Sequence, residues 1–283
     1  MSTHQLTNVA PAGLQADHKP GGISQHGVSD GGGGSAAVSI GPRARGVPVN
    51  TQAPQGISGY KLYTVYRHQP EVPRSTFAAG LIRRAERQLE GDQSWIGRVV
   101  DIADRRPEDC GWPQAPGYPA FAAAEEFWFA HEENLHAHLR GFESPDGVTD
   151  VWHYVVDEHI RKDCRPALVA GARTPGVKQL FYLTRPAEKS RDAFVGHWRD
   201  VHAPLAMRSH VGMWKYVQNV VVESFPSSAP AFDGIAELHY PTLADARTRR
   251  YDSPADRDAI AADRPNFVGA SIGIFSGEYS FCR

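Results

Sequence analysis

The feature that most constrains this chain is an order of secondary-structure elements that occurs twice. Strands are expected where apolar and aromatic residues alternate, and helices where apolar residues recur at helical spacing. The first pass predicts strand 60–67, helix 75–90, strands 95–102 and 125–129, helix 134–139 and strand 151–160. The second pass predicts strand 177–184, a helix capped by Ser190, strands 213–223 and 232–240, helices from Leu243 onward and strand 271–281.

Each βαββαβ pass predicts a ferredoxin-like unit, an antiparallel sheet with helices on one face only. The other face of each sheet is partly apolar and needs a cover. We therefore predict an α+β fold in which two tandem units, residues 58–162 and 177–283, pack their sheets face to face as an α/β barrel within one chain. Residues 163–176 form the linker between the units.

Residues 1–57 differ in composition from the rest of the chain. They are rich in Gly, Pro, Ser, Ala and Gln and contain the run Gly31-Gly32-Gly33-Gly34. Such a segment cannot bury enough apolar surface to offset the entropy lost on ordering. We predict a flexible arm. Its glycines do not indicate a phosphate loop, because no strand precedes them and no helix follows.

The overall composition excludes several classes of partner. Hydrophobic residues make up 41% of the chain and the formal net charge is −2, which favours neither nucleic acid nor an anionic membrane. No apolar run reaches the length of a membrane span, and the N-terminus lacks a secretory pattern. We expect a cytoplasmic protein, monomeric or homodimeric. Cys110, Cys164 and Cys282 lie far apart in the sequence, so we expect reduced thiols and no disulfide framework.

Three blocks of the second pass resemble the EthD family and occur in the order of that family. They are His197–Leu205 (HWRDVHAPL), Tyr216–Asn219 (YVQN) and Phe232–Leu238 (FDGIAEL). The resemblance covers about Val177 to Phe281 and implies a unit of the dimeric α/β-barrel superfamily. That superfamily includes cofactor-free cyclases, isomerases and dehydratases, some monooxygenases and, more distantly, haem enzymes with two fused units. The EthD family itself is associated with oxidative ether degradation.

The first unit lacks these blocks. Its helix 75–90 has neither a Trp-x-x-x-His pair nor His-Ala-Pro, although Glu126-Phe127-Trp128 matches Glu237-Leu238-His239 in position. We predict that the first unit is degenerate and that the second supplies one site. Aromatic side chains of the first unit would then line a pocket: Trp95, Phe127, Trp128 and Trp152.

His202 is the most specific candidate for chemistry. It follows Trp198 by four residues, so the two share a helix face. Pro204 should kink or end the helix near Ala203, which would place His202 in the last turn. The negative end of the helix dipole favours imidazolium there, as a proton donor requires. The alternative is a structural histidine whose ring binds a nearby carbonyl group. Trp198 is expected to form a wall of the site.

Two strands of the second unit offer further polar groups. In 232–240, alternation places Phe232, Ala236, Leu238 and Tyr240 under the helices and Asp233, Glu237 and His239 on the other face, toward the barrel interior or its mouth. The alternative is an edge-exposed or salt-bridged strand face. A carboxylate in an apolar barrel can have a raised pKa, so Glu237 is a candidate general acid or base. In 213–223, Tyr216 and Gln218 share one face and Asn219 lies on the other. The inward face is not determined by the sequence.

Metal and haem sites are not expected. The cluster His131-Glu132-Glu133-Asn134-Leu135-His136-Ala137-His138 has gaps of five and two, whereas a zinc-protease helix needs two histidines at i and i+4. A solvated polar helix fits it better. An axial haem ligand could come only from His197 or His202, because the helix at 243–250 contains no histidine.

The leading hypothesis is an enzyme without cofactor that transfers protons on a small hydrophobic, aromatic or polyketide-like molecule, as a dehydratase, cyclase or isomerase. His202 and Glu237 would act as acid and base, Tyr216 or Asn219 would orient the substrate, and Trp198 would be a wall. Asp233, His239 and Trp128 would contribute to binding. The alternatives are a component of an oxidative degradation pathway and a non-catalytic protein that binds an apolar molecule.

Overall fold

The computed structural model describes residues 51–53, 57–91, 94–105, 121–166 and 168–282. The first half contains β1 (Thr51–Ala53), β2 (Ile57–His68), α1 (Arg74–Gly91), β3 (Gly97–Ala103), β4 (Ala123–Phe129), α2 (Glu132–Arg140) and β5 (Val148–Asp163). The second half begins with β6 (Val177–Thr184), α3 (Arg191–His197), the π-helical turn η2 (Trp198–His202), α4 (Ala203–Ser209) and β7 (Lys215–Phe225). It ends with β8 (Gly234–Tyr240), α5 (Leu243–Thr248), α6 (Pro254–Asp263), the 3-10 turn η3 (Arg264–Asn266) and β9 (Ala270–Cys282).

The two predicted units form one closed antiparallel barrel. The strand order is β2-β4-β3-β9-β6-β8-β7-β5, and β5 pairs again with β2. Within each half the order is that of a ferredoxin-like unit, and the edges of the two half-sheets pair with each other through β3–β9 and β5–β7. The prediction of a tandem α+β barrel within one chain is confirmed.

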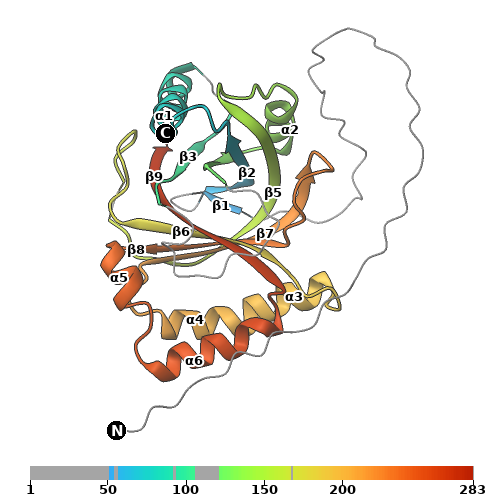
Figure 1. Ribbon diagram of the computed structural model, residues 1–283. Coiled ribbons are helices and arrows are strands. Elements are labelled where there is room, and N and C mark those ends of the chain that lie inside the picture. The colour runs from blue at the N-terminus through green and yellow to red at the C-terminus, as the bar shows by residue number, and fades with distance from the viewer. Residues whose placement is uncertain (1–50, 54–56, 92–93, 106–120, 167, 283) are drawn as a thin grey trace, which may run out of the picture. The chain divides into compact units, whose positions relative to one another are not determined.

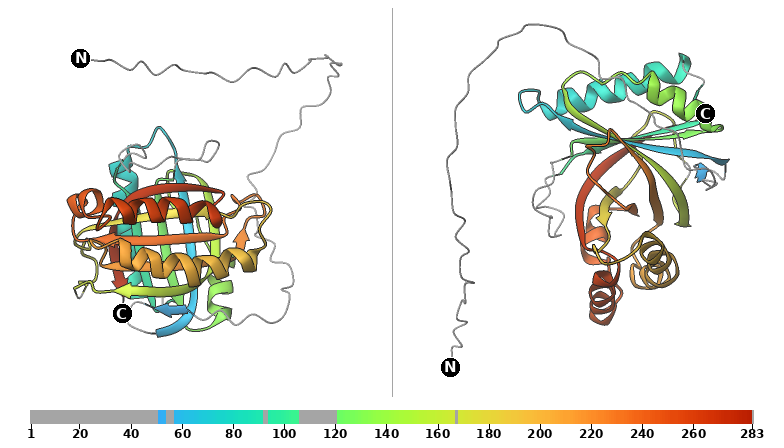
Figure 2. Two further views of the ribbon diagram at one scale, coloured as in Figure 1. Left: turned by 90° about the horizontal axis from the view of Figure 1, so that it is seen from below. Right: turned by 90° about the vertical axis from the view of Figure 1, so that its right-hand side faces the viewer.

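The described helices lie on the outside of the barrel (Figure 1). Helices α1 and α2 cover the sheet of the first unit, while α3, α4, α5 and α6 cover that of the second on the opposite side. Figure 2 shows the α3–η2–α4 segment and α6 running side by side across the outer face of the second sheet. No described helix has the length and apolar character needed to cross a membrane.

Inward-facing side chains fill the barrel in two chemically different parts. One part is an apolar and aromatic cluster that includes Tyr63, Val65, Phe121, Tyr154, Tyr182, Phe232 and Ile274. The other part is a network of buried ions. The Lys61 ammonium lies 2.6 Å from Glu126, 2.6 Å from Glu158 and 2.9 Å from Glu237. Lys178 binds Glu126, and it lies 2.9 Å from Asp101 and 3.2 Å from Glu278.

The ion network repeats between the two units. Strand register places Lys61 opposite Trp128 and, in the second unit, Lys178 opposite His239. Glu126 and Glu237, two residues before those partners, are therefore equivalent positions. The first unit thus differs from the second in its helices, whereas its inward-facing ions have counterparts across the barrel.

The structure differs from the prediction in several strand boundaries and in the side of the sheet on which Phe232 lies. Strand β1 pairs with the start of β2, inside the range 1–57 expected as an arm. The arm prediction otherwise concerns residues 1–50, which lie outside the described residues. Strand β8 begins at Gly234 and not at residue 232. Alternation therefore does not reach Phe232, which lies in the barrel interior and not under the helices as predicted.

The ion network predicts that Lys61 and Lys178 are equally important for stability. Burial alone would lower the pKa of Lys61, but Glu126, Glu158 and Glu237 raise it above its usual value, so the ammonium is retained. Replacement by Met leaves buried carboxylates without their cation. Breaking such a buried pair costs about 3–5 kcal/mol. Urea unfolding should show a loss of that size for Lys61→Met and, separately, for Lys178→Met.

The control for this experiment is Arg257→Met. Arg257 pairs with Asp258 on the surface, where both side chains are more than half exposed. Exposed pairs contribute between zero and about 1 kcal/mol. A lysine variant as stable as the Arg257 variant would contradict the structural role assigned to the network.

Candidate functional site

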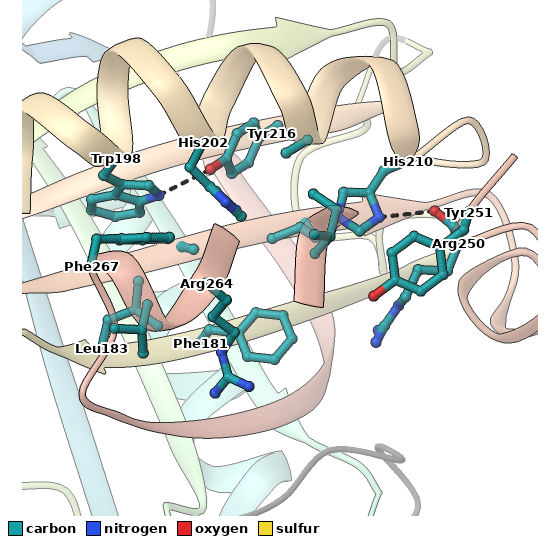
Figure 3. A pocket seen from close by; sticks show the side chains of 15 residues that line it. Phe181, Leu183, Trp198, His202, His210, Tyr216, Arg250, Tyr251, Arg264 and Phe267 are labelled. Carbon is teal, nitrogen blue, oxygen red and sulfur yellow. Dashed lines mark hydrogen bonds between the residues drawn. The ribbon is translucent and has the colours of Figure 1, made fainter. Parts of the chain in front are cut away.

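The clearest cavity lies outside the barrel, between the second sheet and its helices (Figure 3). It measures about 60 Å³. Its walls come from β6, β7 and β8 below and from the α3–α4 segment and the end of α6 above. The lining residues are Phe181, Leu183, Trp198, His202, Ala206, His210, Tyr216, Ala236, Leu238, Arg250, Tyr251, Ile260, Arg264, Phe267 and Val268.

The helix over this cavity begins as the sequence predicts. The Ser190 side chain accepts a hydrogen bond from the Ala193 amide at 3.1 Å, and Asp192 lies in the first turn. The helix does not end near Pro204, however. It passes through the π-helical turn η2, in which the Ala203 amide donates to the Trp198 carbonyl, and it continues to Ser209. Pro204 has no amide proton and its ring would crowd the Asp200 carbonyl, which disfavours a regular α-helical turn here.

The π turn aligns His197 with His202. In a regular α-helix, residues five apart point about 140° away from each other. A π turn closes its hydrogen bonds between residues five apart, so these positions come to lie nearly in line. Both imidazoles accordingly reach Asp263, at the end of α6. His197 Nε2 lies 2.8 Å from Asp263 Oδ1, and His202 Nδ1 lies 2.8 Å from Asp263 Oδ2.

The charge state of His202 follows from this geometry. Burial lowers its pKa below the usual value, and the hydrogen bond and charge of Asp263 oppose that effect. At neutral pH the imidazole is therefore uncharged. Its Nδ1–H donates to the Asp263 carboxylate, which leaves the Nε2 lone pair available. The prediction of a helix end near Ala203 is wrong, because the helix continues to Ser209, and burial rather than a helix end dominates the pKa of His202.

Tyr216 supplies a hydroxyl to the same cavity. Its oxygen accepts hydrogen bonds from Trp198 Nε1 at 3.0 Å and from Gln218 Nε2 at 3.3 Å. Because two donors already point at this oxygen, its own proton is directed elsewhere. Burial raises the pKa of Tyr216 to about 12, so the hydroxyl keeps its proton at neutral pH. Gly234 allows the Trp198 indole to lie against β8, since a Cβ there would come within 2.4 Å of the ring.

Comparison with known proteins agrees with this architecture. Residues 187–271 match the EthD domain family. This match lies within the C-terminal unit, which is called the EthD domain below. No curated protein sequence matches the chain.

Solved structures align with the chain over both units. An anthrone oxidase-like protein aligns with 12% identity and a TM-score of 0.52, over 78% of this chain and 93% of its own. A candidate monooxygenase from Lactobacillus acidophilus NCFM aligns with 10% identity and a TM-score of 0.45, over 79% and 95%. Chlorite dismutase from Candidatus Nitrospira defluvii aligns with 8% identity and a TM-score of 0.42, over 77% and 90%. At such identities the first of these supports the fold alone.

The structure brings together three of the residues singled out in the sequence. His202, Trp198 and Tyr216 all line the cavity of the EthD domain. Gln218, on the same face of β7 as Tyr216, donates to the Trp198 carbonyl at 2.8 Å and helps to hold both aromatic rings.

Glu237, His239 and Asn219 lie on the opposite face of the sheet, inside the barrel. Glu237 accepts from Tyr63 at 2.5 Å and from Asn219 at 2.9 Å and is fully buried. Burial would raise its pKa, but Lys178, Lys61 and Lys215 lower it well below the usual value. Glu237 is therefore a fixed carboxylate, not the group titrating near neutrality that the sequence led us to expect. It also cannot pair with His202, because the sheet separates them.

The remaining predicted residues serve the barrel. Trp128 lies in its interior and donates to Glu158 at 3.1 Å. Asp233 precedes β8 and accepts from the Arg185 amide at 2.8 Å. Burial lowers the pKa of His239 to about 4, so this histidine is neutral beside Glu237 and Glu278. None of them reaches the cavity described above. Of the other expected walls, Trp152 faces the barrel interior, and Trp95 and Phe127 pack under the helices of the first unit.

Several residues around the site were not predicted. His210, Arg250, Tyr251, Arg264 and Phe267 line the cavity, whereas Asp263 and His197 lie behind His202. In a regular α-helix, a spacing of five does not place His197 and His202 on one face. The π turn before Pro204 brings them together, and the sequence pattern does not predict that turn. Asp263 is the last residue of an amphipathic helix that shows no distinctive motif, and its proximity to His202 depends on packing of α6 on the earlier helix.

The carboxylate groups inside the barrel have the spacing of cation sites. Two sets qualify among the described residues, Asp101 with Glu126 and Glu278, and Glu126 with Glu158 and Glu237. The Lys61 and Lys178 ammonium groups already lie between these carboxylates, so the sets do not fit a metal ion. The histidines around α2 form no such set within the described part of the chain. A haem does not fit the cavity either, since about 60 Å³ is far smaller than a tetrapyrrole.

The contact between Asp263 and His202 can be tested without a substrate. The Asp263 carboxylate favours the charged imidazole, so Asp263→Asn should lower the pKa of His202 further. A nearby opposite charge contributes about one pH unit or more. NMR titration of the His202 ring protons measures this directly. An unchanged or higher pKa in the variant would show that the carboxylate does not act on His202.

Proposed function

We propose that the cavity of the EthD domain binds a small apolar carbonyl compound and that His202 removes a proton from the carbon next to the carbonyl group. The observation that supports this proposal is a neutral imidazole, oriented by Asp263, that shares an apolar cavity with a proton-bearing tyrosine hydroxyl. A histidine base of this kind donates a hydrogen bond from one ring nitrogen to a carboxylate and keeps a free lone pair on the other.

Tyr216 would stabilise the product of this step. Removal of the proton places negative charge on the carbonyl oxygen, as in an enolate. A hydrogen-bond donor aimed at that oxygen is worth most in a site from which water is excluded. Trp198 and Gln218 both donate to the Tyr216 oxygen, so its own proton would be available to a ligand. The apolar walls formed by Phe181, Leu183 and Phe267 suit the hydrocarbon part of the molecule.

The enolate can react in two ways. Reprotonation at another atom, or loss of a hydroxyl group, gives isomerisation, cyclisation or dehydration without a cofactor. Alternatively, dioxygen accepts two electrons from the carbanion and forms a C–O bond. Uptake of a proton then gives a hydroperoxide, which loses water to leave a ketone. The second route fits the name of the anthrone oxidase-like neighbour, because an anthrone is a ketone whose methylene C–H, across the ring from the carbonyl, is acidified by conjugation with it.

Hydrogen–deuterium exchange tests the proton transfer directly. Ketones from butanone to acetophenone are incubated in D₂O with the protein, and NMR follows loss of the proton next to the carbonyl. Loss of a general base costs about 10²- to 10⁴-fold in rate. We expect a loss of that size in His202→Ala and a smaller loss in Tyr216→Phe.

The matched control is His159→Ala. His159 also has a ring nitrogen 3.2 Å from an aspartate, Asp157, but it lies on β5 and does not line the cavity. Its replacement should leave exchange unchanged. Exchange that is equal in wild type and His202→Ala would exclude a base role and leave binding without catalysis. Oxygen uptake, measured with an electrode on the same ketones, distinguishes oxidation from isomerisation.

The pH dependence of exchange has a defined sign. A base must be uncharged, and burial lowers the pKa of His202 below its usual value of 6.5. The rate should therefore be constant above about pH 6.5 and fall as the pH drops through the pKa of His202. A rate that rises on acidification would mean that the charged imidazole acts, as a general acid.

A further inference from the structure

A second histidine lines the cavity of the EthD domain and has no part in the proposed proton transfer. His210 directly follows α4 and is buried, at 5% exposure. Both His202 and His210 line the cavity, and both imidazoles point from the helical segment toward the sheet (Figure 3). The cavity therefore contains a polar group that the proposed chemistry leaves unused.

Contacts on one side of the ring fix the orientation of His210. Its Nδ1 lies 2.9 Å from the Arg250 carbonyl oxygen, and the Tyr251 ring lies 5.1 Å away, measured between ring centroids. A carbonyl oxygen can only accept, so Nδ1 carries the proton of this hydrogen bond. Burial lowers the pKa of His210 to about 4, so the ring is uncharged at neutral pH. Nε2 is therefore unprotonated and is an acceptor.

The Nε2 lone pair has no donor from the protein. The bond from Nδ1 to Arg250 is the only hydrogen bond of the His210 side chain among the described residues. The two nitrogens lie on opposite sides of the imidazole, so Nε2 points away from the Arg250 backbone, and the ring itself lines the cavity. A buried acceptor without a partner is unfavourable, and such groups usually bond to a molecule that fills the space beside them.

The charges around the cavity restrict what that molecule can be. Arg250 and Arg264 line the cavity together with His210. An amine would be protonated at neutral pH, and the two guanidinium groups would repel it. A carboxylate has no proton to donate to Nε2. An uncharged hydroxyl group meets both requirements, because it donates a hydrogen bond and brings no positive charge.

We infer that His210 is a specificity-determining residue whose Nε2 accepts a hydrogen bond from a hydroxyl group of the substrate. This inference deepens the proposed function and rests on it for the position of the carbonyl group. Tyr216 would donate to the carbonyl oxygen, His202 would take the adjacent proton, and His210 would hold the hydroxyl group. The substrate class becomes a small apolar ketone that carries a hydroxyl group.

Paired ligands test the hydroxyl subsite in the full chain. Each pair contains a ketone with a hydroxyl group and a ketone of the same shape with a methyl group in its place. The short pair is hydroxyacetone with butanone, and the long pair is para-hydroxyacetophenone with para-methylacetophenone. One hydrogen bond contributes about fivefold in affinity. In NMR titrations we expect the hydroxyl compound of at least one pair to bind about five times more tightly than its methyl counterpart.

His210→Asn is the most informative variant. The asparagine amide can replace Nδ1–H in the bond to the Arg250 carbonyl oxygen, but it has no group at the position of Nε2. The preference for the hydroxyl compound should disappear, while the affinity for the methyl compound stays close to that of the wild type. In the exchange assay, KM for the hydroxyl compound should rise about fivefold and kcat should change little.

The matched control is His153→Asn. His153 is also buried, and its Nδ1 lies 2.9 Å from the Thr64 hydroxyl, but it belongs to the first unit and does not line the cavity. Its replacement should leave the preference unchanged. Nitrogen NMR of the wild-type imidazoles gives a measurement that needs no variant. The His210 ring should carry its proton on Nδ1, and the Nε2 signal should move when the hydroxyl compound binds but not when the methyl compound binds.

Equal binding within both pairs, a preference that persists in a folded His210→Asn protein, or a proton on Nε2 in the free wild type would each overturn the inference. His202→Ala separates it from the proposed function. That variant should keep the preference for the hydroxyl compound even though it no longer exchanges protons. A preference that depends on His210 in a wild-type protein without exchange activity would support the hydroxyl subsite and contradict the proposed chemistry.

Discussion

The pairing of β3 with β9 and of β5 with β7 is the constraint on which the rest of the structure depends. Each half-sheet has two edges, and an unpaired edge exposes backbone donors and acceptors. Joining the edges closes the barrel and encloses every inward-facing side chain. Lys61, Glu126, Lys178 and Glu237 therefore have to neutralise one another, since no solvent reaches them. Ion pairs between the units are a consequence of closure.

Closure also decides which side of the sheet is available for chemistry. The barrel interior holds aromatic side chains in one part and lysine–carboxylate contacts in the other, where the lysines keep the pKa of Glu237 well below its usual value. The outer face of the EthD domain is different, because helices cover it without filling it. The cavity left between helices and sheet contains His202, whose pKa is lowered by burial, and this is the group to which we assign the proposed proton transfer.

One local distortion organises that cavity. Pro204 cannot donate to the preceding turn, and the helix absorbs this by the π turn at Trp198–His202. The wider turn aligns His197 and His202 toward Asp263, which joins the two helical segments of the second unit. A regular helix would direct these two imidazoles apart. Pro204 interrupts the helical hydrogen-bond pattern, and the π turn that results places His197 and His202 around Asp263.

Local patterning by itself determined the element order, the tandem barrel, the cap at Ser190 and the choice of His202, Trp198 and Tyr216 as candidate site residues, because each depends on neighbours in sequence. It also correctly placed Glu237 and His239 inside the barrel through strand alternation. Tertiary structure alone decided that the sheet separates His202 from Glu237, that Asp263 meets His202, and that Lys61 and Lys178 hold Glu237 ionised. These outcomes depend on contacts between distant segments. The sign of a pKa shift depends on which charges are near, and alternation of residues along a strand carries no information about that.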